Sequence, residues 1–475
     1  MRSAALPSAA IEPAAWDAAH AELVTLLRDL IRIPSINPPD PPGPELQAAN
    51  HLASIFRGEG LDPEVFEPQS GRGSVSVRLG SDGSGGEPLL LLSHLDVVPA
   101  NAADGWTHGP FDGDVADGYV WGRGCVDMKN MVALEATVVR LLARRARAAG
   151  LDPSRDPIPG LRRDVVFTCT ADEEAGGIHG VHWLATERQD TLQAAGALNE
   201  AGGVSMELGG RRFYPIGVAE KGYEVFRITV HGTWGHGSMP RDDNALVMAA
   251  EAVRRLAAPG EARVTPPIRE FLDGIAAALP ADQAALVNAI GGEDPRRSEA
   301  AIRALCDPVA ARAIRALLRD TLSPGVLHAG VKYNVIPGQA VLELDYRTLP
   351  GTSGDDAREE VRARLGDVAE HCTIEHVIGA PPVENERGDL YRLLADTIRA
   401  HDPDGVPVPV MAPFATDAKT TALKLGVPTY GFTPLRLAPG EPFLARYHGV
   451  DERVGLDALR WGLPVLYDVV AAYCG

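Results

Sequence analysis

Cysteine is scarce in this chain of 475 residues: there are five, an odd number, scattered from Cys125 to Cys474. No two of them show the two-residue spacing of a zinc knuckle, and an odd count argues against a framework of disulfides. The chain also lacks the roughly 20 consecutive apolar residues that cross a bilayer, and its first residues lack the apolar core of a secretory signal. These absences predict a cytoplasmic protein that does not enter a membrane.

Positive charge is also in deficit, because 45 Lys and Arg residues stand against 64 Asp and Glu residues, for a net charge of −19. Such a balance argues against nucleic acids and anionic membranes as partners, while it leaves a small-molecule or short-peptide substrate open. No internal repeat or low-complexity tract is present. The length exceeds what one ordinary core holds, so two domains are expected.

Apolar segments alternate with helical patterns in the first half of the chain. Residues 89–92 and 165–170 are almost entirely apolar, as expected for strands that are covered on both faces. Residues 16–33 and 128–149 show helical spacing. The first of these helices carries an apolar stripe of Leu23, Leu26, Leu27, Leu30 and Ile31. The pattern predicts an α/β fold with a mainly parallel sheet flanked by helices.

The pattern changes beyond residue 216. Residues 223–230 and 340–345 alternate polar and apolar side chains, which is typical of half-buried strands in a smaller antiparallel sheet. A helical stretch at 261–322 lies between them, and the α/β pattern resumes after residue 350. We therefore predict an inserted α+β unit at residues 218–350, which divides the main domain into residues 1–217 and 351–475.

Two adjacent carboxylates, Glu173 and Glu174, follow the apolar segment 165–170. Neighbouring acidic side chains repel each other unless a cation neutralises them. His94 follows the apolar segment 89–92 in the same way, and ligands of parallel sheets bind beyond the carboxyl ends of the strands. The simplest explanation is a metal site of carboxylates and histidines that activates water.

Each of these residues also has an ordinary structural interpretation. His94 and Asp96 could be a core histidine and a turn aspartate, although an aspartate at this spacing can also fix the tautomer of a ligating imidazole. Asp127 could cap the helix that follows it. Glu200 could belong to a plain turn before glycines, and His448 could be a surface histidine. The combination, more than any single residue, indicates a metal site.

The combination resembles the dizinc amidohydrolases that include aminoacylase, glutamate carboxypeptidase, acetylornithine deacetylase and succinyl-diaminopimelate desuccinylase. The matching segments are residues 93–99, 106–111, 117–129, 170–174, 235–240, 332–337, 345–351 and 416–418. The helical stretch in the inserted unit resembles the carboxypeptidase S-like and N-acyl-amino-acid hydrolase branch. Two departures concern Gly237, where relatives often carry serine, and Phe414-Ala415, where glycines are common.

The resemblance implies two Zn²⁺ ions, for which Co²⁺ or Mn²⁺ could substitute at oxygen-rich ligands. The implied ligands are His94 and Glu200 at one ion, Glu174 and His448 at the other, and Asp127 bridging both. Glu173 is then the general base, and Asp96 is a further catalytic residue beside His94. Such a pair of ions lowers the pKa of a water and polarises a carbonyl, while the base moves a proton to the leaving nitrogen of an amide.

The resemblance also assigns residues to the substrate. His236 would stabilise the oxyanion, reaching in from a partner subunit or upon closure of the inserted unit as a lid, so a homodimer is possible. Asn334 would assist it, Arg347 would bind the substrate carboxylate, and Thr416 would line the pocket. The structural alternatives are an ordinary ion pair for Arg347 and a turn for Asn334.

The sequence thus predicts a zinc-dependent hydrolase that cleaves an amide bond in a dipeptide, at a C-terminal amino acid or in an N-acyl amino acid. A dedicated biosynthetic deacylase or desuccinylase and a hydrolase of ureides are alternatives. A metal- or peptide-binding protein without activity is another, but a pure binder has no use for the non-ligating carboxylate of Glu173.

Overall fold

Two apolar segments of the chain, β3 (Leu89–His94) and β6 (Val165–Thr170), lie side by side in the middle of a ten-stranded sheet. The structure is a computed structural model that describes residues 6–37 and 45–475. The path of the sheet is β1-β2-β6-β3-β7-β18-β9-β16, and β17 and β8 also pair with β9. The further strands are β1 (Glu64–Gln69), β2 (Arg72–Leu79), β7 (Gly196–Asn199), β8 (Met206–Leu208), β9 (Arg211–Glu220), β16 (Val383–Glu384), β17 (Gly405–Ala412) and β18 (Thr429–Gly431).

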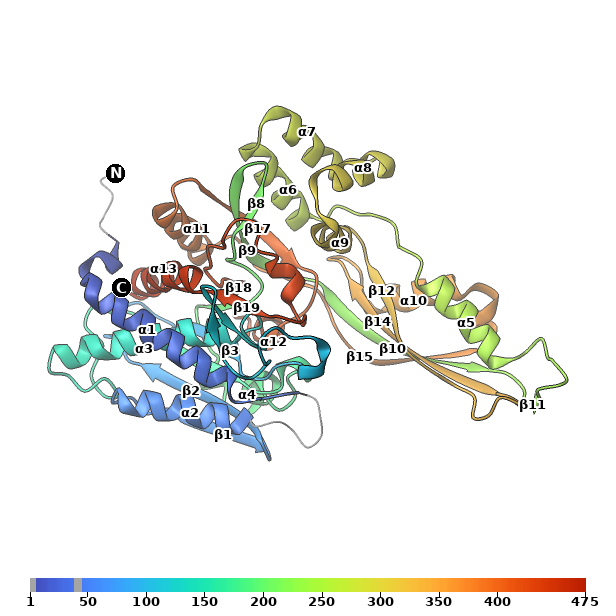
Figure 1. Ribbon diagram of the computed structural model, residues 1–475, viewed down its shortest axis with the longest axis horizontal. Helices are drawn as coiled ribbons and strands as arrows, with labels where there is room; N and C mark the ends of the chain where they lie inside the picture. Colours follow the sequence, from blue (N-terminus) through green and yellow to red (C-terminus); the bar gives the residue numbers. More distant parts are fainter. Residues whose placement is uncertain (1–5, 38–44) are drawn as a thin grey trace.

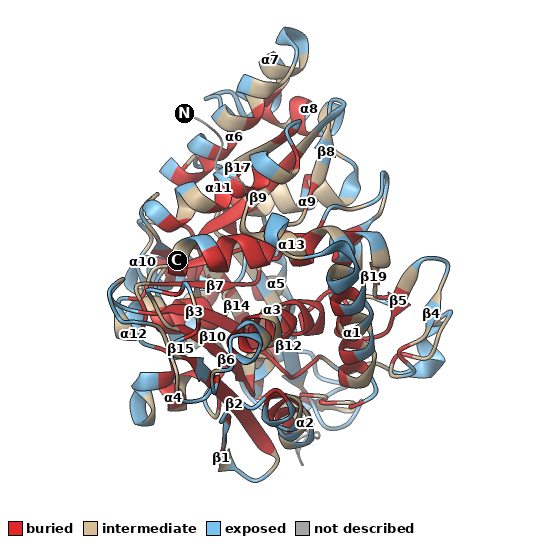
Figure 2. Ribbon diagram, turned by 90° about the vertical axis from the view of Figure 1, so that its left-hand side faces the viewer, coloured by how far each residue is buried: buried red, intermediate tan, exposed pale blue. Residues whose placement is uncertain are grey.

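The centre of this sheet is parallel. β3 pairs in parallel with β6 and β7, and β18 pairs in parallel with β7. Every residue of β3 and β6 is buried, because helices cover the sheet on both faces (Figures 1 and 2). The helices of this part are α1 (Pro13–Ile31), α2 (Glu45–Gly58), α3 (Lys129–Ala148), α4 (Val181–Glu187), α11 (Asp389–His401), α12 (Asp417–Leu425) and α13 (Leu456–Cys474). The predicted α/β fold class is confirmed.

The helix α1 illustrates how an apolar stripe fixes the position of a helix in this fold. Its predicted stripe is entirely buried, and α1 packs against α3 and α13. Lys129, the fully buried first residue of α3, donates hydrogen bonds of 2.9 Å to the carbonyl oxygens of Leu30 and Ile33. A cation at the carboxyl end of a helix satisfies carbonyls that have no partner within the helix. Burial lowers the pKa of Lys129 to about 7.

A separate four-stranded antiparallel sheet has the order β12-β14-β10-β15. Its strands are β10 (Gly222–His231), β12 (Thr321–Ala329), β14 (Gln339–Thr348) and β15 (Cys372–Ala380), and the helices α5 (Ala245–Leu256) and α10 (Gly354–Leu365) pack on it. Phe226, Ile228 and Val230 alternate inward from β10 to form its own core. The short strands β11 (Gly235–His236) and β13 (Val335–Ile336) lie at the end of this sheet that is far from the large sheet (Figure 1).

Two features differ from the sequence-based expectation for the inserted unit. Among the helices of the stretch 261–322, α6 packs against β17 and β9 of the large sheet, with Phe271 and Ile275 in the core of that sheet, and α7 packs on α6. These helices are α6 (Pro266–Ala278), α7 (Ala281–Ile290), α8 (Pro295–Leu305) and α9 (Pro308–Leu317). The smaller sheet also takes in β15, beyond residue 350. The division into domains at 218–350 stays a prediction.

A third, small sheet joins two loops beside the large one, with the order β19-β5-β4. Its strands are β4 (Val115–Ala116), β5 (Tyr119–Trp121) and β19 (Arg453–Gly455).

No helix among residues 6–37 and 45–475 has both the length and the apolar composition needed to cross a membrane.

Glu135 of α3 supplies a prediction on stability. Its side chain is fully buried, and burial raises its pKa well above the usual range. The unfolded chain releases this proton near its ordinary pKa of about 4.3. The free energy of unfolding therefore falls as pH rises above that value, because only the unfolded state ionises.

We expect Glu135→Gln to gain stability relative to the wild type as pH rises from about 5 to about 8, since the amide does not ionise. Urea denaturation at several pH values measures the difference. Glu187→Gln, at an exposed position of α4, is the control and should show no such trend. A difference that stays constant over this pH range would contradict the prediction.

Candidate metal centre

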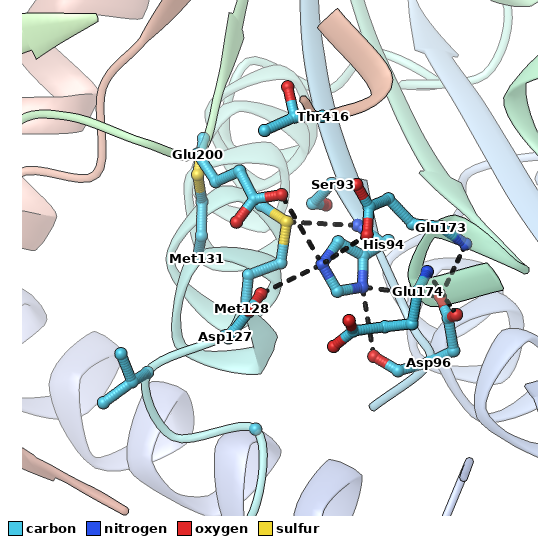
Figure 3. Close-up of polar contacts among 12 residues, drawn as sticks. Ser93, His94, Asp96, Asp127, Met128, Met131, Glu173, Glu174, Glu200 and Thr416 are labelled. Atoms are coloured by element: carbon cyan, nitrogen blue, oxygen red, sulfur yellow. Dashed lines mark hydrogen bonds and ion pairs between the residues drawn. The ribbon is translucent and has the colours of Figure 1, made fainter. Parts of the chain in front are cut away.

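Three neighbouring parallel strands bring acidic and histidine side chains to one edge of the large sheet. His94 is the last residue of β3, and Glu200 directly follows β7. Glu173 and Glu174 follow β6 after a turn at Asp172, whose φ is 68°. Because β6, β3 and β7 are adjacent and parallel, their carboxyl ends meet. Figure 3 shows these side chains gathered around the imidazole of His94.

Asp127 lies between two histidines. Its Oδ1 is 3.1 Å from Nε2 of His94, and its Oδ2 is 3.2 Å from Nε2 of His448. Nε2 of His448 is also 3.4 Å from a carboxylate oxygen of Glu174, and Nε2 of His94 is 3.7 Å from one of Glu200. The structure therefore brings all five predicted ligands together, with one oxygen of Asp127 facing each histidine.

Glu173 lies beside this cluster, with an oxygen 4.0 Å from Nε2 of His94. One ligand atom from each of His94, Glu173 and Glu200 lies within 4.8 Å of the others, and the same holds for His94, Asp127 and Glu174. These distances are suitable for metal ions held between the side chains. The assignment of ligands and of the general base stays a prediction.

Asp96 ties the ends of β3 and β6 together. Nδ1 of His94 is 3.0 Å from the backbone oxygen of Asp96 and 3.4 Å from its carboxylate. That carboxylate accepts the backbone N–H groups of Glu173 at 3.1 Å and Glu174 at 3.0 Å. It touches the imidazole and the backbone of the acidic pair, so its geometry is that of a positioning residue.

Asn37 is a residue that the sequence did not reveal. It is fully buried, and its amide donates to Asp96 at 2.9 Å and to Asp172 at 3.1 Å. These two bonds connect the segment after α1 to the turns that carry His94 and Glu173. A single asparagine next to a proline reads as a turn, so no periodic or motif signal pointed to it.

The electrostatics of the cluster favour cations. Burial raises the pKa values of Glu173 and Glu200 well above their usual range, and neighbouring carboxylates raise them further. Hydrogen bonds to Asp127 and Glu174 raise the pKa of His448 to about 10. The crowded carboxylates thus favour the protonated forms of Glu173 and Glu200 and of the imidazole of His448. Divalent cations would neutralise the same charges, so the residues present fit a metal centre.

Two of the predicted substrate residues lie far from this cluster within one chain. His236 is exposed in β11, at the distant end of the smaller sheet (Figure 1). The backbone N–H of Gly237 donates to the carbonyl of Asn334 at 2.8 Å, so the two predicted residues lie together. The side-chain oxygen of Asn334 is buried without a partner in the described part of the chain.

The other two predicted substrate residues already have partners. Arg347 of β14 donates to Asp345 at 2.8 and 3.1 Å and lies over the ring of Tyr223. The hydroxyl of Thr416, which caps α12, donates to Glu220 at 2.5 Å and accepts from the side chain of Asn199. The substrate roles of Arg347 and Thr416 stay predictions.

Comparison with known proteins identifies the family. Residues 90–472 match the family described as "Peptidase family M20/M25/M40". The chain belongs to this family. The predicted resemblance is confirmed, and membership makes the chain an enzyme that hydrolyses amide bonds.

Individual relatives support the assignment to the M20 family. The chain is 29% identical over 392 residues to a probable carboxypeptidase S-like 2 of Dictyostelium discoideum, a match that covers 78% of this chain and 68% of the relative. It is 28% identical over 402 residues to the human N-fatty-acyl-amino acid synthase/hydrolase PM20D1, covering 81% and 74%. An M20 family metallo-carboxypeptidase from Sulfolobus solfataricus has the same fold, with a TM-score of 0.70, 16% identity and coverage of 95% and 99%.

The protonation of the cluster gives a testable consequence. With a pKa of about 10, His448 is protonated at pH 8 in the metal-free protein. A metal ligand must be deprotonated, so metal binding at pH 8 should release protons, and the affinity should fall as pH falls. Titration calorimetry with Zn²⁺ in two buffers of different ionisation enthalpy measures the number released. His448→Asn should release fewer protons, and an equal number in both proteins would argue against the expected exchange.

Proposed function

We propose that this M20 family member hydrolyses the amide bond of an amino acid or short peptide that carries a free carboxylate. The observation that supports this most strongly is the placement of Asp127 between His94 and His448, with Glu173 beside them. Two ions are proposed because each oxygen of Asp127 faces a different histidine. The first would bind His94, Asp127 and Glu200, and the second Asp127, Glu174 and His448.

Two Zn²⁺ ions, or Co²⁺ or Mn²⁺ in their place, would polarise the scissile carbonyl and make a water more acidic. Glu173 accepts the proton of the attacking water at its carboxylate and returns it to the leaving nitrogen. Glu173 is suited to this proton transfer because its carboxylate lies 4.0 Å from Nε2 of His94 and is not one of the proposed metal ligands. Asp96 holds the backbone of Glu173 and faces the other side of the His94 imidazole, so it fixes both groups in register.

Arg347 is the proposed partner of the substrate carboxylate. Its side chain is 31% exposed, and its guanidinium has donors beyond the pair with Asp345. A planar guanidinium binds a carboxylate through two parallel hydrogen bonds. Thr416 would line the pocket through its position at the start of α12, since its hydroxyl hydrogen is already donated to Glu220.

The names of relatives support both a C-terminal amino acid and an N-acyl amino acid as substrate. Phe414 favours the second. Its side chain is 36% exposed, and its ring centre is 6.4 Å from that of Tyr447, the residue before His448. This places an apolar wall beside the proposed metal ligand, which suits an apolar acyl group. A dedicated deacylase or desuccinylase of a biosynthetic step is the alternative within enzymes.

We further propose a homodimer in which His236 reaches the metal centre of the partner subunit. His236 and Asn334 are distant from the cluster of their own chain, and exposed apolar side chains surround them. These are Trp234, Met239, Val331 and Tyr333, which are 59, 66, 82 and 96% exposed. Exposed apolar patches of this kind are typical of interaction surfaces. The cytoplasm is the proposed location, and the five free cysteines support it.

Replacement of the proposed base separates catalysis from metal binding. We expect Glu173→Ala to bind metal like the wild type but to lose about 10²- to 10⁴-fold in kcat, because a general base contributes that much. The measurement is hydrolysis of a panel of N-acyl amino acids and dipeptides after metal reconstitution, with metal content determined in parallel. If wild type and variant are equally inert with metal bound, the protein is a binder and the proposal fails.

Complementation tests the role of His236. His236→Ala and Glu173→Ala should each be inactive alone. When the two chains are co-expressed, the mixed dimer has one site with an intact Glu173 and a His236 from the partner, so activity should return. If His236 acts within its own chain, no site in the mixed dimer is complete and activity stays absent.

A further inference from the structure

Glu452 connects the two loops that carry Asp127 and His448. It is fully buried, lies four residues after His448 and directly precedes β19. The pairing of β19 with β5 places it beneath the turn of residues 122–127. Its backbone oxygen accepts the N–H of Gly122 at 2.9 Å.

The carboxylate of Glu452 is the centre of that turn. One oxygen accepts three backbone N–H groups, from Gly124 at 3.0 Å, Val126 at 2.6 Å and Asp127 at 3.1 Å. The other oxygen accepts Nη1 of Arg123 at 2.7 Å. Successive N–H groups that converge on one anion fix the backbone of a turn more tightly than its own hydrogen bonds can.

Arg123 extends the same connection to the second loop. Its Nη2 donates to the backbone oxygen of His448 at 3.3 Å, while Nη1 binds Glu452. His448 has a φ of 56°, a conformation that residues other than glycine adopt only when their surroundings hold them there. The Arg123–Glu452 pair therefore contacts the backbone of both residues that face each other across the cluster.

We propose that Glu452 and Arg123 are positioning residues that set the carboxylate of Asp127 opposite His448. This inference rests on the proposed function only for the assignment of Asp127 and His448 as metal ligands. A buried ion pair is a poor way to stabilise a fold, because desolvation offsets the attraction. Its value here is the placement of Asp127, since every side-chain hydrogen bond of Glu452 in the described chain goes to residues 123–127.

A matched control lies in the same loop. Glu441 is also buried, with its side chain 6% exposed, and it binds Arg446 at 3.1 Å and Arg453 at 3.0 Å. None of its described ion pairs or hydrogen bonds goes to residues 122–127. Loss of charge at Glu441 therefore disturbs a carboxylate that binds two arginines in the same loop, without touching the turn of Asp127.

The test compares Glu452→Gln with Glu441→Gln. Each variant and the wild type are stripped with a chelator, checked by far-UV circular dichroism and thermal unfolding, and titrated with Zn²⁺ against a chromogenic chelator. We expect Glu452→Gln to lose about 10- to 100-fold in affinity for Zn²⁺, as for other residues that orient metal ligands, and Glu441→Gln to keep the wild-type affinity. The absorption spectrum of the Co²⁺ form should change in Glu452→Gln only.

Equal affinities and equal Co²⁺ spectra in wild type and Glu452→Gln would overturn the positioning role and leave the proposed function intact. A wild type that binds no Zn²⁺ would overturn both. If Glu452→Gln does not fold, Glu452→Asp replaces it, because the shorter side chain keeps the charge beside Arg123 but cannot reach all three N–H groups. The same loss of affinity is then expected, and its absence overturns the inference.

Discussion

Concentrated negative charge at the carboxyl edge of the large sheet is the constraint on which the rest of this structure depends. Asp127, Glu173, Glu174 and Glu200 lie around two imidazoles, with little exposure to water. Buried carboxylates at this spacing raise one another's pKa values and take up protons unless cations neutralise them. Four carboxylates share only two imidazoles here, so the cluster is suited to a ligand of high positive charge.

The surroundings of the cluster are organised to hold the backbone more than the side chains. Asp96 accepts the N–H groups of Glu173 and Glu174, and Glu452 accepts those of Gly124, Val126 and Asp127. Both carboxylates are fully buried, and each accepts a further side-chain donor: Asp96 accepts the amide of Asn37, and Glu452 accepts the guanidinium of Arg123. Turns would otherwise be the most mobile part of such a site. Anchoring them on buried anions lets three strand ends and two loops hold their side chains in one arrangement.

The sequence predicted those parts of the site that follow from strands. Apolar runs in β3 and β6 predicted a parallel sheet, and polar residues directly after such runs predicted a site at its edge, so His94, Glu173 and Glu174 could be found. The alternating patterns at 223–230 and 340–345 predicted strands but not that β15 pairs beside them, and the helical pattern at 261–322 did not reveal the sheet on which α6 packs. Glu452 and Asn37 act through backbone groups of distant turns, which leave no periodic signal. Their roles rest on hydrogen bonds to residues that are distant in the sequence.

All proposed metal ligands come from the part of the chain that forms the large sheet and the loops around it. Arg347 comes from the smaller sheet, whereas His236 lies in β11 and Asn334 directly before β13, the pair of short strands at its far end. The charge constraint therefore acts on one part only. The smaller sheet has its own core around Phe226 and Ile228 and is free of that constraint. Its surface can therefore vary without changing the arrangement of the cluster. A metallo-carboxypeptidase with 16% identity keeps the same fold over nearly the whole chain, so both the large and the smaller sheet persist although most side chains differ.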